Sequence, residues 1–309
     1  MKVFFVASGN KSVGCVSPFV QSQYDSLSRE GLEMVLFPIR GKGWKAYARA
    51  ILQLRKAIRS ERPDVVHAHY SVCGIVATIA ALCYRTKVVV SILGSFPHRN
   101  FKRRWVRFCI KHVWDATIVK SQRTADQLEM QLPVIPNGVN LEQFSIIPHD
   151  EARSLCGFEE GKRYIVWCSD PARPEKRYDW AEAATQRLND PNTVLFPLYG
   201  KPHDKVVRYL CAADLLLLTS VSEGSPNVIK EAMACNCPIV STDVGDVSWI
   251  TQGVEGTYVA PVGDIAALAS CIRQALDRGG RTEGRKRIEE YGITTHCIAQ
   301  KIINIYDSL

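Results

Sequence analysis

The feature that most constrains the fold is a repeated alternation of short apolar runs, rich in β-branched residues, with longer amphipathic segments. In the first half the apolar runs are KVFFVA (2–7), EMVLFPI (33–39), DVVHA (64–68), KVVVSI (87–92) and ATIVK (116–120). A second series comprises RYIVWCS (163–169), TVLFPLY (193–199), DLLLLTS (214–220), PIVST (238–242) and TYVAP (257–261). Such alternation is typical of βα units around parallel sheets. It predicts an α/β fold in which the pattern restarts once.

The stretch between the two series has the composition of an interdomain connection. LPVIPNGVNLEQFSIIPHDEARSL (132–155) holds three prolines and an Asn-Gly turn, and it shows no regular period. We place the boundary near residue 145, so the first domain spans 1–145 and the second begins at 146. Two doubly wound domains that face each other form a cleft at the carboxyl ends of both sheets, where ligands bind in such folds.

Bulk composition excludes several classes of protein. The chain is 46% hydrophobic and 23% charged, which is ordinary for a soluble globular protein and argues against disorder. The opening MKVFFVASGN is too short for a signal-peptide core, and no apolar run approaches the length of a bilayer span. The 11 cysteines form no zinc-type CxxC pair, which favours reduced, buried thiols in a cytosolic protein.

The net charge of +8 is unevenly distributed along the chain. Residues 1–147 hold 21 Lys or Arg against 9 Asp or Glu, a charge of +12, which leaves −4 for the rest. The densest run, HRNFKRRWVRFCIKHVW (98–114), interleaves basic and apolar residues at helix-like spacing. It is either a solvated helix face or a surface for an anionic partner, such as a membrane or a phosphate-bearing substrate. Nucleic acid is disfavoured because no recognition-helix, zinc-finger or RNP-type pattern accompanies the charge.

Two loops of the first half follow predicted strands. SGNKSVGCVSPF (8–19) carries Gly9 and Gly14 ahead of a helix, where glycine lets an anion approach the free N–H groups. A plain tight turn explains this loop equally well, since it matches no phosphate-binding motif. In VVHAHYS, His67 and His69 project to the same side, but no carboxylate or cysteine completes a metal site. One such histidine is often buried, whereas one at a cleft edge contacts hydroxyls or transfers protons, and we expect His69 to do so.

The loop after the first strand of the second half is rich in cations. SDPARPEKRYDW (169–180) offers Arg173 and Lys176, and its two prolines stiffen the loop. Two cations held rigidly at a cleft would neutralise a diphosphate, with Arg giving forked hydrogen bonds and Lys a point charge. The alternative is a surface loop with incidental charge.

SEGSPNVIKE (222–231) predicts the start of a helix. Ser225 is a favourable N-cap and Pro226 a favourable first helical residue, so the helix should begin there and end near residue 236. Its first N–H groups, around Asn227 and Val228, have no partner within the helix and form a seat for an anion.

Two glutamates flank this seat. Glu223 precedes the helix and Glu231 lies about five residues inside it, roughly 7.5 Å along the axis. Because carboxylates do not bind phosphate, we expect their partners to be hydroxyl groups. The alternative is that both are ordinary surface residues.

With these motifs in place, the chain resembles the family 4 glycosyltransferases, which have the GT-B fold of two facing Rossmann-like domains. The E-x7-E element from Glu223 to Glu231, within EGSPNVIKEAMACNCPIVSTDVGD, is that family's best-known signature. Further matches run along most of the chain: GKGWKAY, DVVHAHY, IPNGVNLEQF, DPARPEKRYD and CAADLLLLTS. The subgroup that it looks most like builds bacterial surface polysaccharides.

The resemblance implies a role for each motif residue. Arg173 and Lys176 would hold the diphosphate of a nucleotide sugar, Glu231 the ribose hydroxyls, and Glu223 the donor sugar. The implied donor-binding set is Gly14, Arg173, Lys176, Glu223, Gly224, Ser225, Pro226, Asn227, Val228 and Glu231. The expected catalytic set is Glu223, Arg173, Lys176 and His69, with His67 and His69 on the acceptor side.

Members of the family are typically retaining and need no metal or other cofactor. The chain contains no Asp-x-Asp motif, so cationic side chains would have to stabilise the leaving diphosphate. The analogy implies front-face attack, in which the leaving phosphate takes the acceptor proton. The sequence also departs from the family. Leu93, in SILGS, replaces a histidine of many relatives, so the donor-sugar contact is either absent or supplied by His69. Base recognition is expected near residues 199–203.

The resulting prediction is a cytosolic GT-B glycosyltransferase of hexosyltransferase type. It would act on a nucleotide sugar and a lipid-linked saccharide at the inner membrane face, which it would reach through the basic first domain. The second domain would end at 293, and the final helix (294–309) would pack on the first domain. Alternatives are a nucleotide-sugar epimerase or a phosphorylase on the same fold, since a fold does not fix the reaction. A further alternative is a non-catalytic protein that binds membranes or nucleic acid.

Overall fold

The computed structural model describes residues 1–9, 16–41, 43–94, 96 and 101–309. The described chain forms two compact units. The first consists of Met1–Asn137 with Thr295–Leu309, and the second of Gly138–Thr294. The chain therefore passes into the second unit before the boundary that we placed at 145, and its last helix belongs to the first unit.

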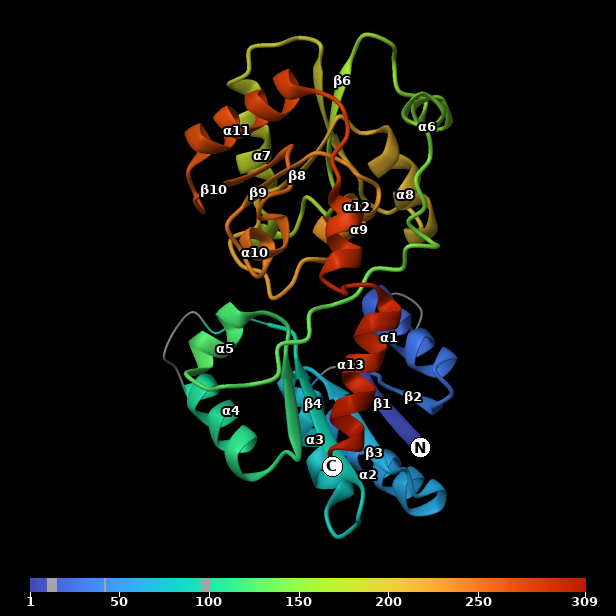
Figure 1. Cartoon of the computed structure of the whole chain (residues 1–309). Coiled ribbons are helices and arrows are strands. Elements are labelled where there is room, and N and C mark those ends of the chain that lie inside the picture. The colour runs from blue at the N-terminus through green and yellow to red at the C-terminus, as the bar shows by residue number, and fades with distance from the viewer. Residues whose placement is uncertain (10–15, 42, 95, 97–100) are drawn as a thin grey trace. The chain divides into compact units, whose positions relative to one another are not determined.

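The first unit is built on a parallel five-stranded sheet in the order β2-β1-β3-β4-β5 (Figure 1). Its strands are β1 (Lys2–Ser8), β2 (Glu33–Ile39), β3 (Val65–His69), β4 (Lys87–Ile92) and β5 (Ala116–Val119). Every residue of β3 is buried, because helices cover both faces of the sheet and a strand lies on each side. This explains why the strands are continuous apolar runs without a polar alternation.

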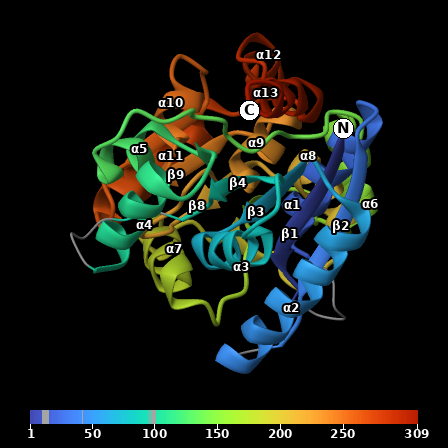
Figure 2. The same ribbon diagram turned by 90° about the horizontal axis from the view of Figure 1, so that it is seen from below.

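Alternate residues of each strand serve two separate cores, one on each face of the sheet. Phe4 and Val6 pack in the core on one face of the sheet, which a group of helices covers. Two of these helices, α2 and α3, lie side by side (Figure 2). The helices of this group are α2 (Trp44–Glu61), α3 (Ser71–Ala81), α4 (Phe101–His112) and α5 (Gln122–Leu128). Val3 and Phe5 face α1 (Pro18–Arg29) and α13 (Thr295–Asp307).

Helix α13 lies beside α1 although the two are at opposite ends of the chain (Figure 1). It buries Ile298, Ile302 and Tyr306 against the sheet. The Ser26 hydroxyl of α1 donates a hydrogen bond of 2.8 Å to the carbonyl oxygen of Thr295. The first unit therefore needs the C-terminal helix to cover this face.

The second unit contains another parallel sheet, in the order β10-β9-β8-β6-β7. Its strands are β6 (Arg163–Trp167), β7 (Thr193–Pro197), β8 (Leu215–Leu218), β9 (Ile239–Thr242) and β10 (Thr257–Ala260). One face packs on α7 (Tyr178–Gln186) and α11 (Ile265–Arg278). The core on the other face includes α8 (His203–Ala212), α9 (Asn227–Ala234), α10 (Val247–Thr251) and α12 (Gly284–Glu290), and α6 (His149–Cys156) packs on α8.

Both sheets have the same strand order when the strands are numbered within each unit, namely 2-1-3-4-5. The direction of winding reverses between the first and third strands of each unit, which are β1 and β3, and β6 and β8. Ligands of doubly wound sheets bind outside the carboxyl ends of the strands at this switch point. The α/β prediction with two doubly wound parallel sheets is confirmed, and in the second unit it directs attention to the loops after β6 and β8.

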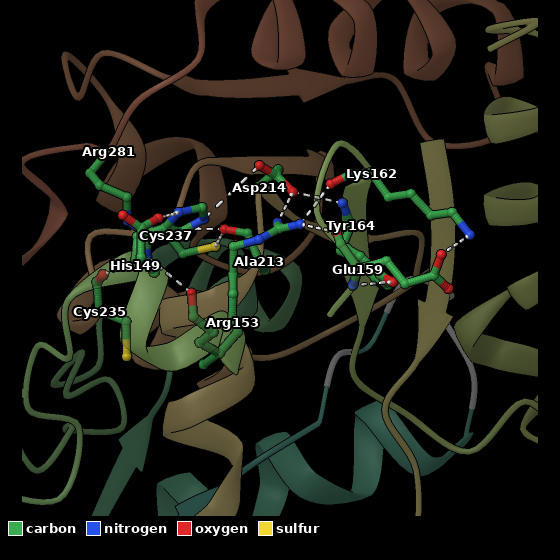
Figure 3. A network of polar contacts seen from close by, with 12 residues as sticks. His149, Arg153, Glu159, Lys162, Tyr164, Ala213, Asp214, Cys235, Cys237 and Arg281 are labelled. Carbon is green, nitrogen blue, oxygen red and sulfur yellow. Dashed lines mark hydrogen bonds and ion pairs between the residues drawn. The ribbon is translucent and has the colours of Figure 1, made fainter. Parts of the chain in front are cut away.

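A network of polar contacts at the other end of the second sheet shows where several of its cations are used (Figure 3). The Arg153 guanidinium of α6 donates to Asp214 Oδ2 (3.2 Å) and to the carbonyl oxygens of Glu159 and Lys162 (2.7 and 2.8 Å). The same Asp214 oxygen accepts from the backbone N–H of Tyr164 in β6 (2.6 Å). Arg153 therefore ties α6 to the starts of β6 and β8.

Candidate functional site

Thr219, which follows β8, helps to fix the loop after β6 to the end of that strand. The Thr219 hydroxyl accepts from the Trp167 indole N–H (2.9 Å) and lies 2.8 and 2.9 Å from the carbonyl oxygens of Lys176 and Arg177. The loop ends in a short 3-10 helix, η2 (Pro174–Lys176). Because these contacts hold its backbone, Lys176 is presented at the switch point of the sheet.

Lys176 and Glu223, both predicted from the sequence, meet at this point. The Lys176 ammonium forms an ion pair with Glu223 Oε1, which also accepts a hydrogen bond of 2.7 Å from the Ser220 hydroxyl. The two side chains are only 16% and 17% exposed, so the pair is partly shielded from water yet open to a ligand. The loops after β6 and β8 thus bring a cation and a carboxylate together.

The other cations of the same loop are engaged elsewhere. Arg173 is about half exposed, and its Nε donates to Glu175 Oε1 (2.8 Å). Arg177 pairs with Asp179 (2.8 Å) and lies over the Trp180 ring at 4.1 Å. Arg173 was predicted to share the diphosphate with Lys176, but in this structure its guanidinium pairs with Glu175, whereas the Lys176 ammonium pairs with Glu223.

The start of α9 differs from the prediction. The helix begins at Asn227, with Pro226 at the cap position, and it ends at Ala234, short of the predicted end. Ser225 does not cap the helix, because its hydroxyl donates to Asp246 Oδ2 (2.7 Å) and accepts from the Lys230 ammonium (2.6 Å). The first backbone N–H groups of α9 nevertheless remain at the amino end of a helix, where an anion is favoured.

Glu231, the second glutamate of the motif, is held by a histidine. His203 Nε2, at the start of α8, lies 3.0 Å from Glu231 Oε1, and His203 Nδ1 lies 3.2 Å from the Gln143 amide nitrogen. The hydrogen bond that His203 donates to the Glu231 carboxylate raises the pKa of His203. The Glu231 side chain is 12% exposed. Sequence reasoning expected base recognition near 199–203 but missed this contact, because it joins two helices through tertiary packing.

The two histidines of β3 are not where we expected them. His67 and His69 are fully buried, because β3 is a central strand and α1 and α13 cover this face. His67 Nδ1 lies 2.5 Å from the Tyr306 hydroxyl and Nε2 lies 2.8 Å from the Ser91 hydroxyl. His69 was expected at a cleft edge, and in this structure its side chain is fully buried.

The buried histidines are also held in their neutral form. Burial, with a smaller contribution from the charge of Lys120, lowers the pKa of His67 to about 3. Burial and the neighbouring His67 and Lys120 lower the pKa of His69 in the same direction. The His69 ring stacks on His67 with ring centroids 4.7 Å apart, and its nitrogens have no hydrogen-bond partner in the described part of the chain. Gly14, the remaining candidate of the first unit, lies outside the described residues.

The first unit contains a cavity of about 370 Å³ at the carboxyl ends of β1, β3 and β4. Aromatic and apolar side chains form much of its wall, and several hydroxyl groups and one lysine add polar contacts. The lining residues include Ser8, Ser17, Tyr47, Tyr70, Ser71, Leu93, Phe96 and Lys102. Leu93, the position that departs from the family pattern, therefore lines a cavity. A mainly apolar hollow with a few polar groups suits an organic ligand.

The described residues contain neither a metal-binding cluster nor a membrane-spanning helix. Within 1–9, 16–41, 43–94, 96 and 101–309, no three or more His, Cys, Asp or Glu side chains are grouped so that they could hold a metal ion. None of the helices in these same ranges combines the length and the apolar character needed to cross a bilayer.

Two family models match the chain, one over each half. The model described as Glycosyltransferase Family 4 matches residues 13–143, and the model described as Glycosyl transferases group 1 matches residues 162–278. The second match contains both Lys176 and the Glu223–Glu231 element.

Individual relatives agree with the family models. TuaC of Bacillus subtilis (strain 168), named as a glycosyltransferase of teichuronic acid biosynthesis, is 28% identical over 65% of this chain, and the match spans 58% of its own length. An Escherichia coli UDP-Gal:alpha-D-GlcNAc-diphosphoundecaprenol alpha-1,3-galactosyltransferase is 21% identical over 74% of this chain and 70% of its own. Among solved structures, Anabaena Alr3699/HepE in complex with UDP superposes with a TM-score of 0.76 at 17% identity, and each chain is covered completely.

Proposed function

We propose that the chain is a family 4 glycosyltransferase, which the two family models over its halves support, and that it transfers a sugar from a nucleotide-sugar donor to a hydroxyl acceptor. The product would be part of a polysaccharide or a glycolipid, as the names of several relatives indicate. The observation that carries the proposal is the meeting of Lys176 and Glu223 at the switch point of the second sheet, beside the helix that carries Glu231.

The donor diphosphate binds at Lys176 and the start of α9 in this proposal. In the structure the Lys176 ammonium is paired with Glu223, so a diphosphate would replace the carboxylate as its partner. The N–H groups at Asn227 and Val228 add the positive end of the helix dipole. Glu223 is then free to accept hydrogen bonds from the hydroxyl groups of the donor sugar. Arg173 would contact the diphosphate as a second cation if its exposed side chain left Glu175 and adopted another rotamer.

The nucleoside is bound further along α9. Glu231 accepts hydrogen bonds from the ribose hydroxyls, while His203 keeps the carboxylate oriented through the 3.0 Å contact. The His203 ring is in turn oriented by Gln143. Tyr199, which is largely exposed just before α8, is placed to take part in base recognition.

By analogy with the family, the proposed reaction uses no metal ion. The acceptor oxygen forms a bond to the anomeric carbon on the face from which the diphosphate leaves. The bond from that carbon to the phosphate oxygen breaks with its electron pair, and the leaving phosphate takes the acceptor proton. The configuration is therefore retained. Lys176, supported by Arg173, stabilises the negative charge that develops on the diphosphate.

The acceptor is assigned to the cavity of the first unit. Its aromatic residues, Tyr47, Tyr70 and Phe96, provide flat apolar surfaces, and the serine hydroxyls and Lys102 provide polar contacts for a saccharide that carries phosphate. The relative named for a diphosphoundecaprenol-linked substrate motivates a lipid-linked saccharide as the acceptor class. A direct contact from His69 stays a prediction, which requires that its buried ring becomes accessible.

The surface of the first unit supports peripheral binding to an anionic membrane. The predicted basic run at 98–114 contains α4, on which Phe101 is 82% exposed and Phe108 is also exposed among lysines and arginines. Exposed residues of α2 form a second stripe at spacings of four and three residues: Lys45, Arg49, Leu52, Lys56 and Arg59. Basic residues beside exposed apolar groups are suited to an anionic lipid surface.

Co-sedimentation with vesicles tests the membrane part of the proposal. The protein should bind vesicles that contain an anionic phospholipid and should not bind vesicles of phosphatidylcholine alone. The double variant Phe101→Ser/Phe108→Ser should bind the anionic vesicles less. Equal binding of this variant and the parent would reject α4 as the membrane contact.

The enzymatic proposal is tested by binding and by product release. A thermal-shift screen of nucleoside diphosphates should identify a ligand, because a ligand of the folded state raises its stability by mass action. Release of nucleoside diphosphate from the sugar donor should then require a glycan acceptor. Conversion of the donor sugar without release would favour an epimerase, dependence on orthophosphate would favour a phosphorylase, and no nucleotide binding at all would favour a non-catalytic membrane protein.

A further inference from the structure

A buried ion pair lies beneath the turn that carries Glu223. The Lys230 ammonium of α9 lies 3.1 and 2.9 Å from the two carboxylate oxygens of Asp246, which precedes α10. The side chains are only 1% and 4% exposed. The Ser225 hydroxyl completes the group, since it accepts from Lys230 (2.6 Å) and donates to Asp246 (2.7 Å). Neither Lys230 nor Asp246 is among the site residues predicted from the sequence.

Stability alone does not account for this pair. Taking two charges out of water costs several kcal/mol each, and well-packed apolar residues at the same positions are often as stable or more stable. The neighbouring residues Ile229, Ala232 and Met233 are buried and apolar, so an apolar pair would be compatible with the surroundings. A buried polar group differs from an apolar pair in requiring one particular geometry of its partners.

The geometry that the pair fixes is that of the turn between Glu223 and α9. Ser225 lies in this turn, and its hydroxyl joins both charges. Gly245, at φ +59°, packs against the same turn, and a Cβ there would lie 2.8 Å from the carbonyl oxygen of Gly224. The loop that leads from β9 to α10 therefore contacts the turn both through Gly245 and through Asp246.

The other end of the turn is held from the same side. The Thr242 hydroxyl, at the end of β9, donates to the carbonyl oxygen of Ser220 (2.7 Å), and the Ser220 hydroxyl donates to Glu223. Glu223 and the N–H groups of α9 thus lie on a short segment that is held at two points. Thr242, the last residue of β9, holds one end, and Asp246, in the loop after β9, holds the other. Removal of one anchor should let the segment move while the sheet stays intact.

We propose that Lys230 and Asp246 are positioning residues, which act through Ser225 to fix Glu223 and the first N–H groups of α9 for the donor. They touch no substrate themselves. The catalytic consequence rests on the function proposed above, whereas the effect on the turn does not. The pair thus lowers the stability of the fold relative to apolar residues and, in return, keeps the site preorganised.

The apolar replacement Lys230→Met/Asp246→Leu separates positioning from stability. Its melting temperature should stay close to that of the parent, because both charges are removed together. Hydrogen exchange of the backbone amides at 224–231 should become at least about tenfold faster, which corresponds to about 1.4 kcal/mol less local protection. Exchange at these amides as slow as in the parent would overturn the proposal. This measurement needs no nucleotide and stands even if the proposed function fails.

Nucleotide binding and kinetics give the second readout. Where the parent binds UDP, the double variant should bind it about tenfold more weakly and should show a lower kcat with an unchanged KM for the acceptor. The double variant could show faster exchange at the turn and still bind UDP as tightly as the parent. This result would overturn the proposal that the pair positions the turn for the donor. A parent that binds no nucleoside diphosphate would instead reject the proposed function, and the exchange data alone would then decide whether the pair holds the turn.

Two further variants keep the result interpretable. Ser225→Ala leaves the ion pair in place, so it should fold even if the double variant does not, and it should also speed exchange at the turn. Arg153→Met removes the cation of the network at the opposite end of the sheet (Figure 3). It should lower the melting temperature but leave exchange at 224–231 unchanged. Faster exchange there in Arg153→Met would show that any loss of stability has this effect and would overturn the proposal.

Discussion

Lys176 is the residue on which the donor chemistry of this protein depends most, because it is the cation that the β6 loop presents to Glu223. We expect Lys176→Ala to weaken nucleoside diphosphate binding by about 1.5–3 kcal/mol, the range of a hydrogen bond to a charged group. Arg173→Ala should cost less than about 1 kcal/mol, because its side chain is half exposed and paired with Glu175. Calorimetry measures both, with Arg177→Ala as a control that should bind as the parent does. A larger loss in Arg173→Ala than in Lys176→Ala would reverse the two assignments.

Glu223 should affect binding and transfer in opposite ways. Glu223→Gln removes the negative charge that pairs with the Lys176 ammonium. Because UDP carries no sugar and so does not need the carboxylate, it should bind to this variant at least as tightly as to the parent. Sugar transfer should fall by about 10²-fold or more, because the carboxylate can no longer orient the donor sugar. Titration with UDP and a steady-state assay separate the effects. Weaker UDP binding in this variant would mean that Glu223 supports the nucleotide rather than the sugar.

The motif residues of the second unit could be predicted from the sequence, but their partners could not. Their position after recognisable strands, together with the family resemblance, singled out Lys176, Glu223 and Glu231. Sequence reasoning could not give His203 beside Glu231, or Asp246 beside Lys230, since these pairs come from separate elements brought together by packing. It also placed His69 at a cleft edge, whereas its side chain is buried on the face of the sheet that α1 and α13 cover.

At the scale of elements, α13 depends on one buried hydrogen bond as well as on apolar packing. The Tyr306 hydroxyl lies 2.5 Å from His67 Nδ1, and burial raises the pKa of Tyr306. We expect Tyr306→Phe to lower the free energy of unfolding by about 1–3 kcal/mol, because it leaves a buried ring nitrogen without its partner. Tyr258→Phe, in β10, should change it by less than about 0.5 kcal/mol. Equal effects in urea titrations would show that packing alone holds α13.

Elements with strong local signals were predicted well, and their ends less so. Each apolar run of the sequence contains a strand, because runs this short that are bounded by turn residues favour a strand over a helix. The start of α9 moved to Asn227 because Ser225 uses its hydroxyl for Asp246 and Lys230 instead of capping the helix. A local propensity was overridden there by a tertiary contact.

At the scale of the whole molecule, the buried histidines should make the first unit sensitive to acid. His67 has an ordinary pKa of 6.5 and about 3 in the folded protein. The unfolded chain therefore binds more protons between these values, so stability falls as the pH drops below 6.5, by up to about 1.4 kcal/mol per pH unit for one histidine. Urea titrations at pH 7 and pH 5.5 measure this loss. His69→Leu should reduce the slope, because burial also lowers the pKa of His69, whereas an unchanged slope would show that His69 does not contribute to the acid sensitivity.

Because the chain forms two units, nucleotide binding should stabilise mainly the unit that holds the donor site. This expectation allows a test of the site and of the proposal that it needs no metal ion. Apart from Gly14, the residues assigned to the donor all lie in Gly138–Thr294. Saturation with UDP at about 100 times its Kd should stabilise the folded state of that unit by about 2.7 kcal/mol. Slower hydrogen exchange should therefore spread through the second sheet, with little change in the first. Because Lys176 and the start of α9 supply the positive charge, EDTA should leave this protection and the rate of sugar transfer unchanged. Loss of both in EDTA, restored by magnesium, would show that a metal ion carries the diphosphate instead.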